Sequence, residues 1–307
     1  MKVSTSLFFE RASTQLGNVQ GSLAKTQEQL STGKQITKPS DEPDKASTVT
    51  RLESEMARQK SYQETLTTVQ TRLTSQETSL RNVSDVLIRI KELTVQAAND
   101  TVSSADRKAI GLEIIGLRDQ LLSQANAQDT NGNFLFAGSR STQAPYALDA
   151  NGHITYQGDQ SRMKVQVGDN RRMNANTPGS DVFLRVIRDD GKGNQVGVNF
   201  FEALKDLSDA ITNGLPKDMD RGLGEIDILQ QGISNATAQI GSDMSVVDMQ
   251  NSVLDETTLR LKSTLSDVQD LDYTEAITRM NKDQLALEAA QSTFAKIAKL
   301  TLFNYIN

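Results

Sequence analysis

The N-terminal region repeats apolar side chains at alternating steps of three and four residues. The repeating positions are Phe9, Ala12, Leu16, Val19, Leu23, Thr26 and Leu30. This spacing puts the apolar groups on one face of an α-helix and is typical of a coiled-coil seam. The segment Ser31–Ala46, STGKQITKPSDEPDKA, interrupts the repeat. Gly33 can end a helix, and the residues before Pro39 and Pro43 are disfavoured in the α region, so the first helix should end near Gly33.

A second seam runs from about Pro43 to Asn99, and Asp41 or Asp44 is expected to cap this helix. Its positions are Val49, Leu52, Met56, Leu66, Val69, Leu73, Gln76, Leu80, Val83, Leu87 and Ile90, with a slip of phase near Gln59–Gln63. At about 1.5 Å per residue the helix would be on the order of 80 Å long. A compact domain of this size is narrower, so the pattern predicts a rod.

A returning helix is predicted over Ser103–Asn126, because Ser103 and Asp106 resemble a capping box. The hydrophobic period then becomes strand-like. YALDANGHITYQG carries a hairpin signal at Asn151-Gly152, and RMKVQVGD, DVFLRV and QVGVNF are further strand candidates. DTNGN (129–133) and DDGKGN (189–194) are expected to form turns, since neither has the complete spacing of a calcium loop. These features predict a small all-β insert.

Helix returns at about Phe200–Thr212, and another heptad run follows Pro216. It comprises Ile226, Leu229, Ile233, Ala236, Ile240, Met244, Val247, Asn251, Leu254, Thr258, Leu261, Leu265 and Val268, and, after a weak interruption at SDVQDLDYTEA, Ile277, Met280, Leu287, Phe294 and Ile297. The expected fold is mainly α with a small β domain. A long antiparallel helical hairpin, or coiled-coil rod, would join the N- and C-terminal regions, with the all-β insert at its tip. Three domains are expected: 1–44 with 270–307, 45–138 with 200–269, and 139–199.

The chain ends on an apolar stretch, KLTLFNYIN, although most termini fray with small polar residues. Burial of a few large side chains does not offset the entropy of ordering such a long segment. Both terminal helices are therefore expected to be disordered alone and to order on assembly, unless an isolated chain buries its own tail. The predicted assembly residues are Phe9, Leu16, Val19, Leu23, Leu30, Phe294, Ile297, Leu302, Phe303 and Ile306.

Composition narrows the possible functions. Of 307 residues 36% are hydrophobic and 5% aromatic, the net charge is −6, and there is no cysteine. A nucleic-acid partner would require a basic face, and no apolar run reaches the ~20 residues that span a bilayer. The single histidine, His153, is expected to be an ordinary turn residue, so no metal, cofactor or catalytic residue is predicted. An enzyme is the weakest hypothesis, and a soluble adaptor rod explains the heptads but not the apolar end.

Three segments resemble bacterial flagellins. They are STSLFFERASTQLGNVQGSLAKTQEQLSTGKQITKPSDEPDKA at the N-terminus, IRIKELTVQAAND at Ile88–Asp100, and LSDVQDLDYTEAITRMNKDQLALEAAQSTFAKIAKLTLFNYIN at the C-terminus. Together they cover well over half of the chain in the family's order. The resemblance implies an extracellular structural protein of the bacterial flagellum that is not an enzyme. It also implies export without a cleaved signal peptide.

Within this family, KPSDEPDKA, NFLFAGSRSTQAPY and the ending LFNYIN are more similar to the junction subunits between hook and filament than to flagellin itself. That resemblance implies a ring of copies of this chain. The ring would contact a hook-side hook-associated protein on one side and flagellin on the other. An export chaperone would bind the C-terminal segment before secretion. Flagellin remains the alternative.

Overall fold

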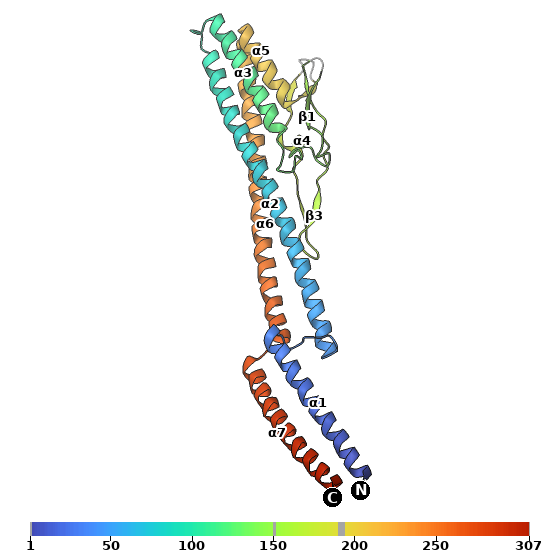
Figure 1. Cartoon of the computed structure of the whole chain (residues 1–307). Coiled ribbons are helices and arrows are strands. Elements are labelled where there is room, and N and C mark those ends of the chain that lie inside the picture. The colour runs from blue at the N-terminus through green and yellow to red at the C-terminus, as the bar shows by residue number, and fades with distance from the viewer. Residues whose placement is uncertain (1, 150–151, 190–193, 307) are drawn as a thin grey trace. The chain divides into compact units, whose positions relative to one another are not determined.

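The computed structural model describes residues 2–149, 152–189 and 194–306, with the side chains of residues 2–6, 8 and 297–306 outside the described set. The described elements are α1 (Lys2–Thr32), α2 (Pro43–Ala97), α3 (Ser104–Ala125), β1 (Tyr146–Leu148), β2 (Ile154–Tyr156), β3 (Lys164–Gln166), β4 (Arg172–Asn174), α4 (Gly179–Val182), β5 (Val186–Asp189), β6 (Gln195–Val198), α5 (Phe200–Asn213), α6 (Pro216–Gln269) and α7 (Tyr273–Ile306) (Figure 1). The expected class, mainly α with a small β part, is confirmed.

The chain divides into two compact units, each formed by segments distant in sequence. Unit 1 comprises Met1–Gln59 and Glu256–Asn307, and unit 2 comprises Lys60–Asp255. The helices α2 and α6 contribute residues to both units. The predicted division into three domains remains a prediction.

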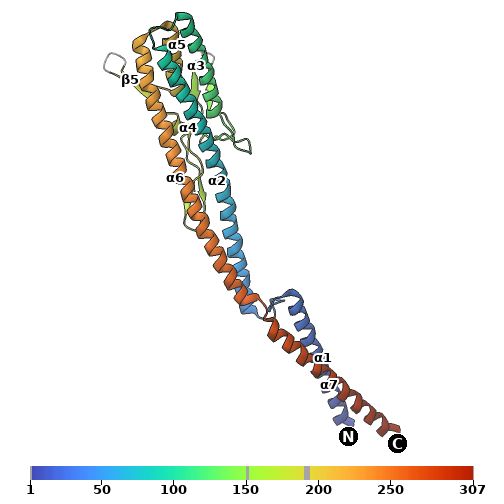
Figure 2. The same ribbon diagram turned by 90° about the vertical axis from the view of Figure 1, so that its left-hand side faces the viewer.

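In unit 2 the predicted seams of α2 and α6 form the core. Leu66, Leu80, Leu87 and Ile90 of α2 are fully buried, as is Ile240 of α6. The two helices lie side by side in both views, with α3 and α5 packed against each other beside them (Figures 1 and 2). The heptad pattern therefore identifies the face of each helix that is covered.

Local sequence signals explain where the helices of unit 2 begin and end. The Ser103 hydroxyl accepts a hydrogen bond from the Asp106 backbone N–H at 3.2 Å, which confirms the predicted cap of α3. Asn199 caps α5 in the same way through the Glu202 N–H at 2.8 Å. Gly214 follows α5 with φ of 64°, a conformation that favours glycine.

The start of α2 differs from the prediction that Asp41 or Asp44 would cap it. The helix begins at Pro43, so Asp44 already lies in its first turn. The Asp41 carboxylate instead bonds Lys25 and Thr37. Proline at the first helical position needs no hydrogen-bond partner for its nitrogen, which explains the start.

The strand-bearing segment contains antiparallel pairs β1–β2, β3–β4 and β5–β6 in its described part. The hairpin at Asn151-Gly152 is confirmed by the register Tyr146↔Tyr156 and Leu148↔Ile154, although Asn151 lies outside the described residues. RMKVQVGD and QVGVNF contain β3 and β6 as predicted. Much of the segment between the pairs is irregular, which the prediction of an all-β insert did not anticipate.

One strand prediction was wrong. DVFLRV contains the end of the short helix α4 and the bend at Phe183, and only its last residue, Val186, belongs to β5. Phe183 lies in a bend because its ring packs against the rings of Phe136 and Phe200, at centroid distances of 5.7 and 5.2 Å. The alternation of apolar and polar residues also did not predict β4.

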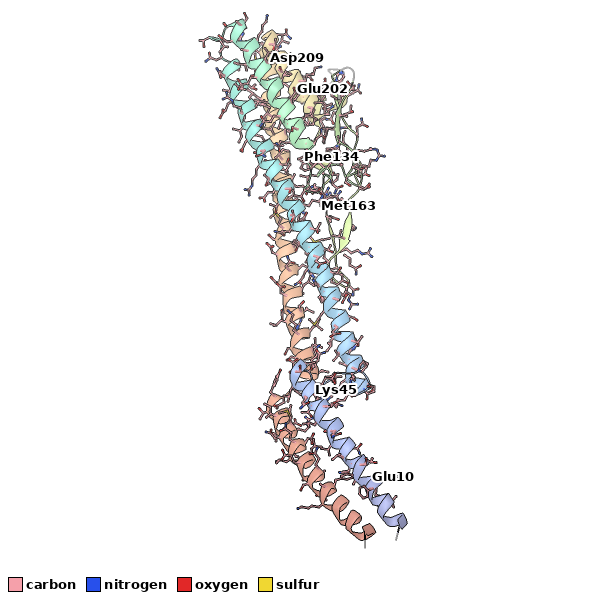
Figure 3. The ribbon with its side chains drawn as sticks, viewed as in Figure 1. Glu10, Lys45, Phe134, Met163, Glu202 and Asp209 are labelled. Atoms are coloured by element: carbon pink, nitrogen blue, oxygen red, sulfur yellow. The ribbon has the colours of Figure 1, made fainter. Side chains whose placement is uncertain are left out.

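The strand-bearing segment lies along the side of the unit 2 helices, whereas the sequence placed it at their tip. Three side chains of the helices hold it there. Gln76 of α2 donates to the Leu135 carbonyl at 3.0 Å, and Gln250 of α6 donates to the Val167 carbonyl at 3.1 Å. Tyr62 donates to Asp169 at 3.2 Å. Figure 3 shows Phe134 and Met163 of this segment beside α2, and Glu202 and Asp209 on α5.

We expect Leu87→Ala to destabilise unit 2 by about 2–5 kcal/mol, because it leaves a cavity where the side chain is fully buried. The neighbouring variant Ile88→Ala is the control, since Ile88 is 45% exposed and its truncation should change stability by no more than about 0.5 kcal/mol. Urea unfolding followed by circular dichroism measures both. Equal shifts in the two variants would contradict the assignment of the buried face.

Candidate assembly interface

The terminal helices α1 and α7 pair with each other within unit 1, and they lie side by side in both views. The Phe9 and Phe294 rings meet edge to face at a centroid distance of 5.2 Å and an interplanar angle of 80°. Further along, the Ser22 hydroxyl donates to the Asp283 carboxylate at 2.6 Å. The heptad faces of the two helices are therefore directed at each other.

Pairing leaves the predicted assembly residues only partly covered. The described members of the set are half-buried, and they are Phe9, Leu16, Val19, Leu23, Leu30 and Phe294. The side chains of the other members, Ile297, Leu302, Phe303 and Ile306, lie outside the described residues. The structure brings Phe9 and Phe294 together, while the role of the whole set in assembly stays a prediction.

Polar side chains occupy the seam where α1 approaches its end. Thr26 and Gln29 are buried. The Gln29 amide donates to the Gln35 carbonyl at 2.5 Å, which ties the helix to the segment after it. Ile36, Leu271 and Ala276 of unit 1 are buried as well. The end of α1 is thus better covered than its start.

Two short connections pair with each other, one after α1 and one between α6 and α7. We call residues 33–42 and 270–272 the terminal junction. The Leu271 N–H donates to the Gly33 carbonyl at 3.0 Å, and the Gln35 N–H donates to the Gln269 carbonyl at 2.8 Å. Lys34 and Asp270 form an isolated antiparallel bridge. The first terminal helix therefore ends, and the second begins, at one hydrogen-bonded element.

Gly33 and Asp272 set the backbone of the terminal junction. Gly33 has φ of 70°, and a Cβ atom there would lie 2.8 Å from the Tyr273 hydroxyl. The Asp272 carboxylate caps α7 by accepting from the N–H groups of Thr274 and Glu275 at 2.9 and 3.1 Å. The sequence predicted the helix stop at Gly33, whereas DLDYTEA was interpreted only as a weak interruption. Aspartate followed two and three residues later by threonine and glutamate is the signal for this cap.

An ion pair fixes the segment that follows Gly33. Lys25 of α1 lies 3.2 Å from the Asp41 carboxylate. The hydrogen bond from Lys25 lowers the pKa of Asp41 below its ordinary value. The charged pair thus joins the first helix to the proline-containing segment that separates it from α2.

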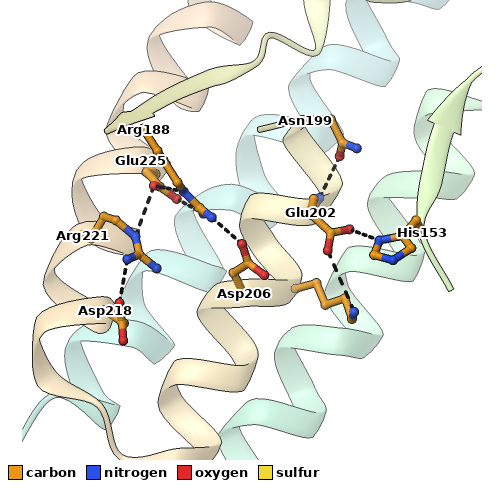
Figure 4. A network of polar contacts seen from close by, with 9 residues as sticks. His153, Arg188, Asn199, Glu202, Asp206, Asp218, Arg221 and Glu225 are labelled. Carbon is orange, nitrogen blue, oxygen red and sulfur yellow. Dashed lines mark hydrogen bonds and ion pairs between the residues drawn. The ribbon is translucent and has the colours of Figure 1, made fainter. Parts of the chain in front are cut away.

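Unit 2 carries a polar network that the sequence did not predict (Figure 4). Arg188 of β5 makes two hydrogen bonds to Glu225 of α6, at 2.6 and 2.7 Å, and also bonds Asp206 of α5. The bonds to Glu225 raise the pKa of Arg188 above its ordinary value. Together with the buried Val186, this bidentate pair attaches the short β5–β6 hairpin to the helices.

The remaining candidate chemical groups have structural partners. His153 Nδ1 lies 2.9 Å from Glu202, and its backbone N–H donates to Asp149, which agrees with a turn residue. Asp129 accepts from the N–H groups of Asn131 and Asn133, so DTNGN forms the predicted turn. The turn predicted at DDGKGN lies mostly outside the described residues. In the described part of the chain, no group of three or more potential metal ligands occurs, and no helix could cross a membrane.

Paired terminal helices, long heptad helices and a laterally attached strand segment define a mainly helical protein with a small strand-bearing part. The model of the bacterial flagellin N-terminal helical region matches residues 3–141, and that of the C-terminal helical region matches residues 223–306. The chain belongs to the flagellin family.

Relatives within the family cover the whole chain. Flagellar hook-associated protein 3 of Salmonella typhimurium is 28% identical over 316 aligned positions, which span 99% of both chains. The solved structure of Bacillus cereus FlgL is 26% identical, has a TM-score of 0.57 and covers 70% of this chain and 99% of its own. That of Xanthomonas campestris FlgL is 23% identical with a TM-score of 0.63, covers 70% of this chain and 99% of its own, and supports the fold.

We expect Gly33→Ala to destabilise unit 1 by about 1–2 kcal/mol, because alanine is strained at positive φ. The added methyl group must also displace the Tyr273 hydroxyl. Because the terminal helices are expected to order on assembly, thermal unfolding of assembled chains, followed by circular dichroism, measures the loss.

Gly17→Ala is the matched control for this substitution. Gly17 lies within α1, and a Cβ atom there meets nothing within 4 Å. Alanine should therefore stabilise the helix by about 0.5–1 kcal/mol. Effects of the same sign in both variants would contradict the proposed geometry of the terminal junction.

Proposed function

We propose that this chain is the structural subunit at the junction between the flagellar hook and filament. The observation that carries the proposal is its similarity to flagellar hook-associated protein 3 over 99% of both chains. In this role copies of the chain form a ring that contacts a hook-side hook-associated protein and flagellin. The chain acts outside the cell and performs no catalysis.

Partial burial of the terminal seam supports this role. A seam that remains half-buried in one chain gains further burial when neighbouring chains pack against it. Leu7 and Leu285, which lie outside the predicted seam, are 46% and 67% exposed, and Ile277, which the heptad pattern placed in the seam, is 45% exposed. In the proposed ring these side chains contact neighbouring copies, together with the ten assembly residues predicted from the sequence.

The composition of α1 supports ordering of the terminal helices on assembly. Gly17 and Gly21 lie within this helix and contact no other atoms at the Cβ position. Each costs about 1 kcal/mol of helix stability relative to alanine. The helix therefore depends on packing, and packing increases when subunits assemble. An apolar C-terminal segment that orders only on assembly also requires protection before export, which is the proposed role of the export chaperone.

Flagellin is the second candidate, because both matched models describe flagellin helical regions. Assembly on isolated hooks that carry the hook-side hook-associated protein distinguishes the two. A junction subunit adds one short layer and then accepts flagellin, whereas a flagellin extends into long filaments. Electron microscopy of the hook ends measures the outcome, and long filaments of the chain alone would refute the junction role.

Leu285→Gln is expected to weaken layer formation on such hooks at least about fivefold, because it places an amide in an apolar contact between subunits. Leu112→Gln is the matched control, since Leu112 is 75% exposed on α3 of unit 2 and Leu285 is 67% exposed on α7. The yield of decorated hooks at increasing protein concentration measures the effect. Equal loss in both variants would contradict a specific role for α7.

Hydrogen exchange tests whether the terminal helices order on assembly. In the purified chain, amides in 1–44 and 270–307 should exchange rapidly, while the buried part of α2 near Leu80 and Leu87 stays protected. In assembled layers the terminal amides should become protected. Strong protection of both ends in the purified chain would show that one chain buries its own tail, and ordering on assembly would be rejected.

A further inference from the structure

A cavity of about 560 Å³ opens in unit 2 beside the first turn of α5. Its inner residues are the aromatic and aliphatic side chains Tyr146, Ile154, Phe183, Phe200 and Phe201, which are at most 6% exposed. Tyr156, Thr155, Gln160, Ser180, Arg185 and Asn199 complete the lining. The volume and the mixture of an apolar floor with a polar rim are those of a small-molecule site.

Tyr146 at the floor of this cavity has an unused hydroxyl group. The residue as a whole is 6% exposed, but its hydroxyl oxygen keeps contact with solvent and makes no hydrogen bond among the described residues. Its backbone groups, in contrast, both bond the Asn126 side chain, at 2.9 and 3.0 Å. Burial raises the pKa of Tyr146 well above its ordinary value, so the hydroxyl remains a neutral donor. A bound acceptor would therefore find a donor at the cavity that no protein group already occupies.

The charged side chain available at the rim of the cavity is positive. Among the described residues of the lining, Arg185 is the only ionisable one other than tyrosine, and it is exposed. The nearby carboxylates are occupied elsewhere: Asp181 pairs with Arg162 at 2.8 Å, and Asp159 accepts from the Ser139 N–H at 2.8 Å. Figure 4 shows Glu202, the acidic residue in the first turn of α5, bonded to His153. An anionic ligand would therefore find an available guanidinium group at the rim.

We propose that this cavity binds a small amphiphilic carboxylate, with its ring or hydrocarbon group against Phe183, Phe200 and Phe201. The carboxylate contacts Arg185 at the rim, and a second polar atom of the ligand accepts from the Tyr146 hydroxyl. Edge-to-face contacts among these aromatic rings, such as Tyr146 with Phe201 at 5.2 Å, keep the walls rigid, so the site is formed before binding. This site is separate from the terminal helices and does not depend on the junction role.

Calorimetric titration of the full chain with 6-hydroxy-2-naphthoate tests the proposal, because this probe combines an aromatic body, a carboxylate and a hydroxyl acceptor. We expect saturable binding of one probe per chain in the micromolar to millimolar range. Arg185→Gln should weaken it about tenfold, since a hydrogen bond to a charged group is lost. Tyr146→Phe retains the ring and should weaken it about threefold to tenfold.

Arg172→Gln is the control, since it removes an exposed positive charge from β4 outside the cavity lining and should leave binding unchanged. The neutral probe 2-naphthol should bind wild type more weakly and be insensitive to Arg185→Gln. Circular dichroism confirms that each variant is folded. Absence of saturable binding to wild type would overturn the proposal, as would equal affinities of the Arg185→Gln, Tyr146→Phe and Arg172→Gln variants.

Discussion

Coverage of apolar heptad faces is the constraint on which the rest of this structure depends. A helix with one apolar stripe is stable only where another surface covers that stripe. In unit 2 the seams of α2 and α6 are covered by each other, by α3 and α5, and by the strand-bearing segment, so Leu80 and Leu87 are fully buried. In unit 1 the pair α1 and α7 reaches only partial burial at Phe9 and Phe294. The same sequence pattern thus gives a complete core in one unit and an incomplete one in the other.

The difference in burial between the seams of the two units follows from how many elements cover each seam rather than from the residues in the seam. A pair of helices covers one side of each seam and leaves the flanks in water. Leu7 and Leu285 show the consequence, because their side chains remain about half or more exposed. The terminal junction holds the two helices together through Gly33 and Leu271, but backbone hydrogen bonds add no apolar cover. Further cover has to come from another molecule, which is why incomplete burial fits a subunit that assembles.

Much of the helical structure could be predicted from the sequence, because heptad spacing, proline positions and capping residues act locally. Ser103 as the cap of α3 and Gly33 as the end of α1 needed no knowledge of distant residues. The strand-bearing segment was predicted less well. Phe183 lies in a bend because its ring packs against Phe136 and Phe200, which are distant in sequence. No local period encodes such a contact, and the same holds for Arg188 with Glu225.

The terminal seam and the cavity at Tyr146 also differ in how far the sequence predicts them. Phe9 and Phe294 were predicted because they belong to long periodic runs at the two ends of the chain. The cavity at Tyr146 joins β1, β2, the bend at Phe183 and the start of α5, so only folding brings its lining together. Its side chains also stabilise the attachment of the strands, since Tyr146 contacts both Phe183 and Phe201. Packing alone explains those rings, but it does not require an open cavity of about 560 Å³ beside them or the exposed Arg185 in its lining. The cavity and the guanidinium group in its lining therefore separate a binding site from an ordinary aromatic core.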